Sequence, residues 1–549
     1  MSKEAIKYYN NKLSVLKTDR QSYEPVWADI IDHCAPDLKG YLNLDRKNDG
    51  QRNDDVIYDG TPAEYAQKCA AGMWAAISSP SRPWMRRKMR NKQMNEATEA
   101  RQWLDEVTEI DYDTMQSSNF YQAMFTVYLH LVVIGAACMI IDQDYEDTIN
   151  CTALNIGEYW LGINGKGKVD TVFRELKYRA SQLKDKFGED SLPQKVKDSI
   201  TDNNPMGNEY TVVHVIEPDS RKLAPFKKPW VSAYYLEAEN EDKFLQVRGY
   251  NRKPFAAPRW FTLNGETYGK MNPGRNMIGN CKQLQTMVYD FHEALQKVIN
   301  PPLQGPSDTL GTNQISAIPG AYNPIDVTGP DNTIKPLFAV NPDLASMWQS
   351  IQDKKDQIAS GFYIDLFMAV SMRMDKDMTA EEVRSIAGER MLALGPGLDN
   401  MHTELLNEVI NIIFDYSFDT ELYPDPPEEI QGQETNVDYT SVLAQAQKMV
   451  DLSRIDQVLA YAERIAALTG QAPRKVNYDQ ILDEAGEMAG APAGILYDDK
   501  TMQQMQEQAA QQQQMEQLAQ TASVAADVGS KMAKMPMDQD TALNRMLGV

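Results

Sequence analysis

Two amphipathic stretches on either side of a segment that cannot be helical constrain this chain more than any other feature. Apolar residues recur at helical spacing over 281–298, and an Asn-Pro-Pro sequence at 300–302 ends that stretch. They recur again over 344–358, with Gly361 at the end. The intervening segment 303–337 is rich in Gly and Pro, which favours loops with short strands at most. The pattern predicts a hairpin-like stalk of two helices around a compact, loop-rich module.

The rest of the chain combines further helices with one strand-rich region. Helical spacing over 6–31 predicts helices near the N-terminus, and Thr61-Pro62 begins another that Pro80 closes. From about 151 to 263 the apolar residues alternate with period two, which predicts strands broken by a charged helical insertion near 180–200. The fold class expected is therefore α+β and mainly helical.

The most apolar stretch, 120–141, is about as long as a bilayer requires. His130 and other polar residues interrupt its first half, and Gly135 divides it into a helical and a strand-like part. A buried helix followed by a buried strand is the better interpretation. The start of the chain is typical of an amphipathic helix rather than of a signal peptide.

The net charge and the cysteine content restrict the classes of function that this chain can have. Asp and Glu number 78 against 55 Lys and Arg, a formal charge of −23, so the chain is poorly suited to hold nucleic acid by neutralising phosphates. A protein that DNA merely slides past remains compatible with this charge. The cysteines are odd in number and form no CxxC pair, which indicates a reducing compartment, and the histidines do not cluster, so no structural metal is expected.

No segment predicts an active site. Residues 162–168 fit GxxxxGK, but Val169 stands where Ser or Thr should reach magnesium, and an alternating strand pattern follows instead of a helix. Gly165 and Gly167 favour the turn of a β-hairpin instead. The basic run 82–92 is interpreted as a solvated strand and turn paired with neighbouring acids, with a DNA-phosphate patch as the alternative. We expect neither enzymatic activity nor a cofactor.

The last third is organised around a methionine-rich segment and an acidic one. Four methionines lie between 368 and 378, a capping box at 379–382 begins a long helix, and Gly395-Pro396-Gly397 should break it. The stretch 415–438 contains eight acids and no Lys or Arg, and we interpret it as a domain boundary. The glutamine-rich segment 501–520 is compatible with low-complexity disorder or with a helix that bundles with copies of itself.

Several of these features, in this order, resemble the portal proteins of short-tailed bacteriophages, the head-to-tail connector family. The resemblance covers nearly the whole chain. It is carried by Tyr23-Glu24-Pro25-Val26-Trp27, Ala66 to Ile77 running into Pro80, Pro83-Trp84-Met85-Arg86, Pro254-Phe255, Pro258-Arg259-Trp260, Gly265-Glu266-Thr267-Tyr268-Gly269, the capping box, Leu394-Gly395-Pro396 and the Gln- and Met-rich C-terminus.

The resemblance implies a portal fold that assembles as a ring. By position it implies a wing (1–275 and the long kinked helix 379–430), a stem of two helices (276–300 and 342–361), a clip (301–341), a tunnel loop (362–378), a crown (431–497) and a C-terminal helical barrel (498–549).

The implied function is a ring of twelve subunits at one capsid vertex of the virion, through which double-stranded DNA is packaged and ejected and to which the tail attaches. Implied partners are the large terminase, a tail adaptor, major capsid and scaffolding proteins and internal core proteins, with no membrane and with assembly in the host cytoplasm. Candidate DNA-facing residues are Lys282, Lys297, Lys354, Lys355, Met368, Met372, Arg373, Met374 and Lys376. Candidate docking residues in the clip are Gln304, Gly305, Asp308, Asn313, Tyr322, Asn323, Asp331 and Asn332.

Two other function classes stay open on the sequence alone. One is a different virion structural protein, such as a tail or internal core component. The other is a nucleotide-driven DNA motor, which would have to use Lys168 in the segment that fits GxxxxGK.

Overall fold

The computed structural model describes residues 2–42, 54, 56–91, 98–144, 146–201, 204–237, 243–306, 315–325, 333–338, 343–371, 395–428, 430–433, 435–440, 459–462, 464 and 481. The chain divides into two compact units, Met1–Val450 and Asp451–Val549. All the helices and strands named below belong to the first unit. The crown beyond 440 and the barrel that the resemblance implies lie almost entirely outside the described residues.

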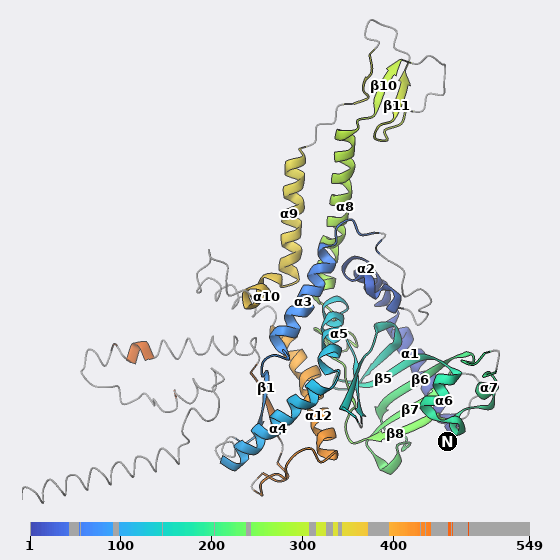
Figure 1. Ribbon diagram of the computed structural model, residues 1–549, viewed down its shortest axis with the longest axis vertical. Coiled ribbons are helices and arrows are strands. Elements are labelled where there is room, and N and C mark those ends of the chain that lie inside the picture. The colour runs from blue at the N-terminus through green and yellow to red at the C-terminus, as the bar shows by residue number, and fades with distance from the viewer. Residues whose placement is uncertain are drawn as a thin grey trace, which may run out of the picture. The chain divides into compact units, whose positions relative to one another are not determined.

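A five-stranded antiparallel sheet carries the first helix on one face. Helix α1 (Ser2–Arg20) packs Tyr9 and Leu13 against Phe173 and Val215, which point to the same face of the sheet. Two short helices, α6 and α7, separate the second and third strands and confirm the expected helical insertion (Figure 1). The sheet order is β4 (Tyr159–Ile163), β5 (Val169–Arg179), β6 (Glu209–Pro218), β7 (Trp230–Leu236), β8 (Gln246–Tyr250), and the inserted helices are α6 (Ala180–Phe187) and α7 (Gln194–Lys197).

The main core gathers helices from distant parts of the chain around a small antiparallel sheet. Helix α5 (Phe120–Val133) is followed by strand β2 (Met139–Asp144), both buried, which confirms the interpretation of the apolar stretch 120–141. Each described helix is too short or too polar to cross a bilayer. The other elements of this core are α2 (Glu24–Cys34), α3 (Thr61–Ile77), α12 (Asn407–Asp419), β3 (Thr148–Ala153) and β9 (Phe255–Ala256).

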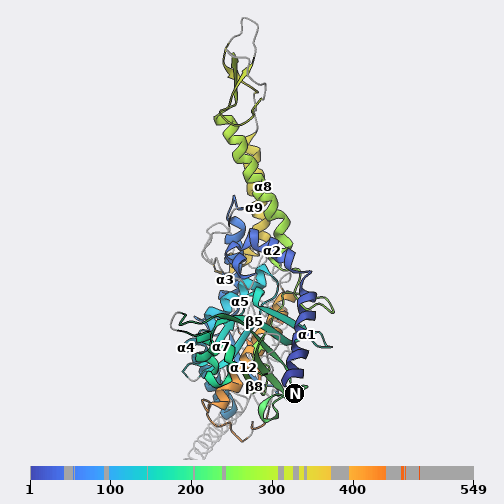
Figure 2. The ribbon, with the colours of Figure 1, turned by 90° about the vertical axis from the view of Figure 1, so that its right-hand side faces the viewer.

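Helices α8 (Pro273–Ile299) and α9 (Leu344–Gly361) run side by side, as Figures 1 and 2 both show. A three-stranded sheet follows their far ends, in the order β11 (Tyr322–Ile325), β10 (Leu303–Pro306), β12 (Lys335–Pro336), with β10 and β11 parallel. The sequence therefore predicted both helices to within a few residues. A further helix, α10 (Ile364–Ser371), occupies part of the segment that the resemblance implies to be a tunnel loop.

Short helical turns connect the larger elements of the first unit. Beyond Gly395 the described chain is helical, and a π-helical turn at His402–Leu406 interrupts it just before α12. The 3-10 turns are η1 (Pro36–Tyr41), η3 (Ile156–Glu158), η4 (Glu189–Ser191) and η5 (Pro225–Lys227).

The predicted domain boundary in 415–438 is wrong, because this stretch leads into a strand of the first unit. Strand β13 (Thr435–Tyr439) pairs antiparallel with β1 (Met85–Met89), beside helix α4 (Thr98–Ser117). Strand β13 thus meets the middle of the basic run 82–92, and Lys88 forms an ion pair with Asp438, the one acid of β13, at 3.2 Å. The basic run is thus a strand paired with acids, as expected, and the compact unit continues to 450.

One arginine of β1 departs from the expected solvated strand by pointing into the core. Arg87 Nε lies 2.5 Å from Asp111 Oδ2 on α4, and both side chains are about 1% exposed. Burial raises the pKa of Asp111, although Arg87 and the Tyr423 hydroxyl, which donates to its other oxygen, act in the opposite direction. The guanidinium also stacks over the ring of Phe414 and donates to the carbonyl of Ile410.

We predict that Arg87→Met lowers the free energy of unfolding of the first unit by roughly 3 to 5 kcal/mol, because it leaves the Asp111 carboxylate buried without a counter-ion. Arg86→Met is the matched control. Arg86 pairs with Asp105 at the surface, 3.4 Å apart, and an exposed pair contributes about 1 kcal/mol or less. Denaturant unfolding of the variants tests this, and equal losses in both would contradict the assignment.

Candidate functional site

A close approach of two backbone segments attaches the helix pair α8 and α9, which the resemblance implies to be the stem, to the main core. A Cβ atom on Gly269 would lie 2.0 Å from the Gly135 carbonyl oxygen, so no side chain fits at position 269 unless the backbone shifts. Gly135 itself has φ of 87°, a conformation that favours glycine. Its carbonyl accepts a hydrogen bond from Trp260 N at 2.9 Å. Gly135 lies two residues after the end of α5, and Gly269 lies four residues before the start of α8.

Asn272 completes this attachment at the residue before α8. Its side-chain amide is 1% exposed and donates to the carbonyls of Val132 and Val133, both at 2.8 Å. These are two of the carbonyls at the end of α5 that have no partner within that helix. The start of the first stem helix is therefore bound directly to the end of α5.

Between two and three turns further along, α8 contacts α2 through a charge pair and a thiol pair. Lys282 Nζ lies 2.5 Å from Asp29 Oδ2. The sulfur atoms of Cys34 and Cys281 are 3.7 Å apart and buried. The hydrogen bond to Cys281 and burial both raise the pKa of the Cys34 thiol, so Cys34 is a neutral packing partner at neutral pH.

Gln285 of α8 hydrogen-bonds the loop at 58–59, and Asp59 of that loop forms an ion pair with Lys355 of α9. Its side-chain oxygen accepts from the backbone N–H groups of Tyr58 and Asp59 at 2.7 and 2.9 Å, and its amide donates to the Asp59 carbonyl. The Asp59 carboxylate lies 2.6 Å from Lys355 Nζ. Burial alone would raise the pKa of Asp59, but hydrogen bonds from Lys355 and Thr61 hold it below its usual value.

The candidate DNA-facing lysines of the stem are mostly engaged with groups of the same chain. Lys282 and Lys355 pair with Asp29 and Asp59 as described, and Lys297 pairs with Glu293 one turn earlier on α8, at 2.6 Å. Lys354 donates to the side-chain oxygen of Gln357 at 2.9 Å. Met368 belongs to α10, and Met372, Arg373, Met374 and Lys376 lie outside the described residues.

The candidate docking residues of the clip divide into exposed and structural ones. Tyr322 is 47% exposed, although its hydroxyl donates to the Pro306 carbonyl. Asn323 is 3% exposed, and its amide group bonds the backbone of Leu303 and Ser316, so within one subunit it stabilises the clip rather than presenting a docking surface. Gln304 and Gly305 lie on β10, and Asp308, Asn313, Asp331 and Asn332 lie outside the described residues.

The segment that fits GxxxxGK is a hairpin turn between β4 and β5, as the sequence predicted. The side chain of Asn164 accepts from the backbone N–H groups of Lys166 and Lys168, so donors that a phosphate-binding loop would offer to its ligand are bonded within the turn. Arg259 Nη2 donates to the Gly167 carbonyl at 2.9 Å, and Arg259 also forms an ion pair with Glu404 of the π-helical turn. This turn is part of the packing and does not have the geometry of a nucleotide site.

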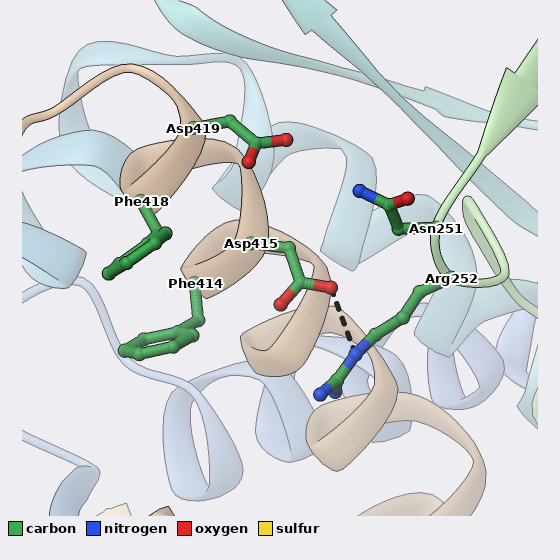
Figure 3. Close-up of a pocket in the computed structure, with 6 residues that line it drawn as sticks. All are labelled: Asn251, Arg252, Phe414, Asp415, Phe418 and Asp419. Carbon is green, nitrogen blue, oxygen red and sulfur yellow. Dashed lines mark ion pairs between the residues drawn. The ribbon is translucent and has the colours of Figure 1, made fainter. Parts of the chain in front are cut away.

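A pocket of about 300 Å³ lies between the end of α12 and the turn after β8 (Figure 3). Asp415 and Arg252 pair across it at 2.9 Å, and burial raises the pKa of Asp415. Its six lining residues place no nucleophile beside a base. In the described part of the chain, His, Cys, Asp and Glu do not gather in any group that could hold a metal ion. The pocket is lined by Asn251, Arg252, Phe414, Asp415, Phe418 and Asp419.

Comparison with known proteins gives a consistent result over most of the chain. The family model described as bacteriophage head to tail connecting protein matches residues 7–496. A probable portal protein of Bordetella phage BPP-1 is 30% identical over 532 residues, covering 96% of this chain and 95% of that protein. The portal protein of Salmonella phage epsilon15 is 30% identical over 496 residues, covering 90% and 89%.

Among solved structures, the chain is similar to one from the virion of a native gene transfer agent particle, with a TM-score of 0.38, 10% identity and coverage of 79% of this chain and 90% of that chain. It is also similar to one from the neck of an empty gene transfer agent particle, with a TM-score of 0.35, 8% identity and coverage of 78% and 90%. These TM-scores are too low to support inferences about this chain.

This chain belongs to the family of bacteriophage head to tail connecting proteins, which confirms the resemblance. Its function is that of a portal protein, the part of the connector that lies between the head and the tail of the virion. A capsid partner on one side and a tail partner on the other follow from that place. Neither curated relative is named as an enzyme.

The residues that attach the stem were not identified from the sequence. Gly269, Gln285 and Asp59 act through partners more than 100 positions away, which no local pattern reveals. The Asn272-Pro273 pair before a helical stripe is the one local signal that could have indicated where α8 begins, since Pro is favoured at the first position of a helix.

We predict that Gly269→Ala destabilises the first unit by roughly 3 kcal/mol or more, because its methyl group would collide with backbone rather than with a side chain that can move. Gly279→Ala is the matched control on α8. A Cβ there meets nothing within 4 Å, and replacing Gly in a helix should stabilise by up to about 1 kcal/mol. Thermal unfolding should show a lower Tm for Gly269→Ala and a higher Tm for Gly279→Ala. Two Tm shifts of the same sign would contradict the steric constraint at Gly269.

Proposed function

We propose that twelve copies of this chain form a ring at one capsid vertex, and that double-stranded DNA enters through it during packaging and leaves through it during ejection. Assembly takes place in the host cytoplasm with major capsid, scaffolding and internal core proteins. Membership of the head to tail connecting protein family over residues 7–496 is the observation that carries the proposal. The paired helices α8 and α9 with a small sheet beyond their ends supply the parts expected for a stem and a clip.

The charge of the chain suits a conduit for DNA. A duplex carries one negative charge per roughly 1.7 Å of axis, so a strongly basic channel would hold it in place. A chain with a formal charge of −23 repels phosphates over about 8 Å at physiological salt, which keeps the duplex centred. The ion pairs of Lys282, Lys297 and Lys355 with acids of the same chain reduce the attraction of the stem for phosphate.

In this proposal the basic residues of the tunnel loop slow the sliding of DNA through the ring. Met368, Met372 and Met374 form a pliable collar in this proposal, and Arg373 and Lys376 make transient phosphate contacts. Methionine suits such a collar because its side chain is apolar and flexible.

Arg373→Ala combined with Lys376→Ala should therefore lower the amount of DNA packaged and retained per particle by about tenfold, while rings still form. Lys166→Ala, which removes an exposed cation from the β4–β5 turn, is the control and should package normally. Nuclease-protected DNA per particle is the quantity to measure. Normal packaging and retention by the double variant would contradict the role of the tunnel loop.

We propose that a separate ATPase, the large terminase, supplies the energy for packaging and docks on the polar residues of the clip. The tail adaptor docks on the clip at a later stage. Tyr322 and the polar residues Asp308, Asn313, Asp331 and Asn332 are the candidate contacts. Asp308→Ala with Asp331→Ala should weaken binding of terminase to purified rings by about tenfold without dissociating the rings. Unchanged binding would remove these residues from the docking site.

A further inference from the structure

Two cysteines that are far apart in the sequence bring their sulfur atoms into contact within the main core. Cys34 is the last residue of α2, and Cys281 lies in α8, 247 positions later. Their sulfur atoms are 3.7 Å apart, and both side chains are at most 1% exposed. All five cysteines of the chain are described and are free thiols. Among them, this is the pair whose thiols hydrogen-bond each other.

The two sulfur atoms need only a short approach to form a covalent bond. A disulfide has an S–S length of about 2.05 Å, so the atoms have to come closer by roughly 1.7 Å in total. Rotation about the Cα–Cβ bonds of the two cysteines moves the sulfur atoms on that scale. A disulfide is therefore compatible with the packing of α2 against α8.

Neighbouring contacts hold α2 and α8 together and so keep the two thiols beside each other. Lys282, which directly follows one of the cysteines, forms an ion pair with Asp29 of α2. Nearer the start of α8, a Cβ atom on Gly274 would lie 2.9 Å from Ile30 Cγ2, so the two helices also approach closely there. Because reactive groups held in contact react faster than groups that must first meet, the thiols are placed to react with each other.

A virion passes from a reducing to an oxidising environment, and each environment favours a different state of this pair. Thiols stay reduced in a cytoplasm, whereas disulfides persist outside the cell. This chain is part of the connector of a virion, and in the proposed function it is assembled in the host cytoplasm. Burial and the hydrogen bond to Cys281 raise the pKa of the Cys34 thiol, so its reactive thiolate form is scarce and the pair oxidises slowly.

We propose that Cys34 and Cys281 form a disulfide after the virion leaves the host cell, with a peroxide as the oxidant. One thiolate attacks a peroxide oxygen, the O–O bond breaks, and the cysteine becomes a sulfenic acid while water leaves. The second thiol attacks that sulfur, which forms the S–S bond and releases a second water. In total the two sulfur atoms lose two electrons, and hydrogen peroxide gains them. The timing rests on the cytoplasmic assembly of the proposed function, whereas the bond itself does not.

The disulfide links α8 covalently to α2 and adds to the attachment that Gly135 and Gly269 provide. A cross-link restricts the unfolded chain more when the loop that it closes is long, and this loop spans 247 positions. Oxidation should therefore lower the unfolded fraction of the first unit at least roughly tenfold at a given urea concentration.

Peroxide treatment of the purified full chain, followed by mass spectrometry, tests the bond. The chain should lose two hydrogen atoms, and peptide mapping should find Cys34 linked to Cys281 at least roughly tenfold more often than any other pair of cysteines. Dithiothreitol should reverse the change. Cys281→Ser should abolish the link, whereas Cys69→Ser, which removes another buried cysteine, should leave it intact. Thiols that stay free, or that become sulfinic acids without linking, would overturn the proposal.

Urea unfolding gives a second reading on the same samples. The oxidised wild type and oxidised Cys69→Ser should each unfold at a higher urea concentration than their reduced forms, while Cys281→Ser should show no such difference. Because every variant is compared with itself, a loss of stability caused by the substitution does not affect the result. Equal midpoints for the oxidised and reduced wild type would contradict the link between α2 and α8.

Released particles test the timing. In infected cells lysed directly into N-ethylmaleimide, the disulfide fraction should be at least roughly tenfold lower than in particles purified without reductant and kept in air. Equal fractions, or no disulfide in the particles, would overturn the proposal. Absence of the chain from the particles would instead refute the proposed function, and the result on the purified chain would still decide whether the bond forms.

Discussion

The backbone contact between Gly135 and Gly269 is the constraint on which the stem depends. It allows no side chain at position 269, and it places the start of α8 against the end of α5, where Asn272 bonds the carbonyls that α5 leaves without partners. Because α9 packs along α8, the direction of both stem helices follows from this contact. The ion pair of Lys282 with Asp29 and the hydrogen bonds of Gln285 fix the same helix to α2 and to the loop at 58–59.

Several basic side chains form ion pairs with acids of the same chain, although the chain as a whole is acidic. Inside the core, Arg87 and Asp111 neutralise each other, and on the stem Lys297 and Lys355 are held by Glu293 and Asp59. Acids outnumber bases over the whole chain, which gives the formal charge of −23, and in the proposed conduit this charge repels DNA phosphates. The described part of the clip (301–341) differs, because Lys335 is its single charged residue.

Local patterns in the sequence predicted the elements of the fold but not their partners. Helical stripes with Pro and Gly at their ends predicted α8 and α9, and alternation predicted the strands that follow Cys151, because those signals lie within one turn or one strand. The pairing of β1 with β13 joins segments about 350 positions apart, so the acidic stretch before β13 was mistaken for a boundary. Similarly, the burial of Asn323 depends on neighbours that its polar character does not reveal.

Electron microscopy of the purified chain, with its mass determined in parallel, tests the central claim most directly. The account predicts rings with an open axial hole wide enough for a duplex of roughly 20 Å, and a mass near 744 kDa for twelve copies of a 62.0 kDa chain. Solid particles, or six-fold assemblies without a central hole, would contradict it and would instead indicate a different structural component of the virion.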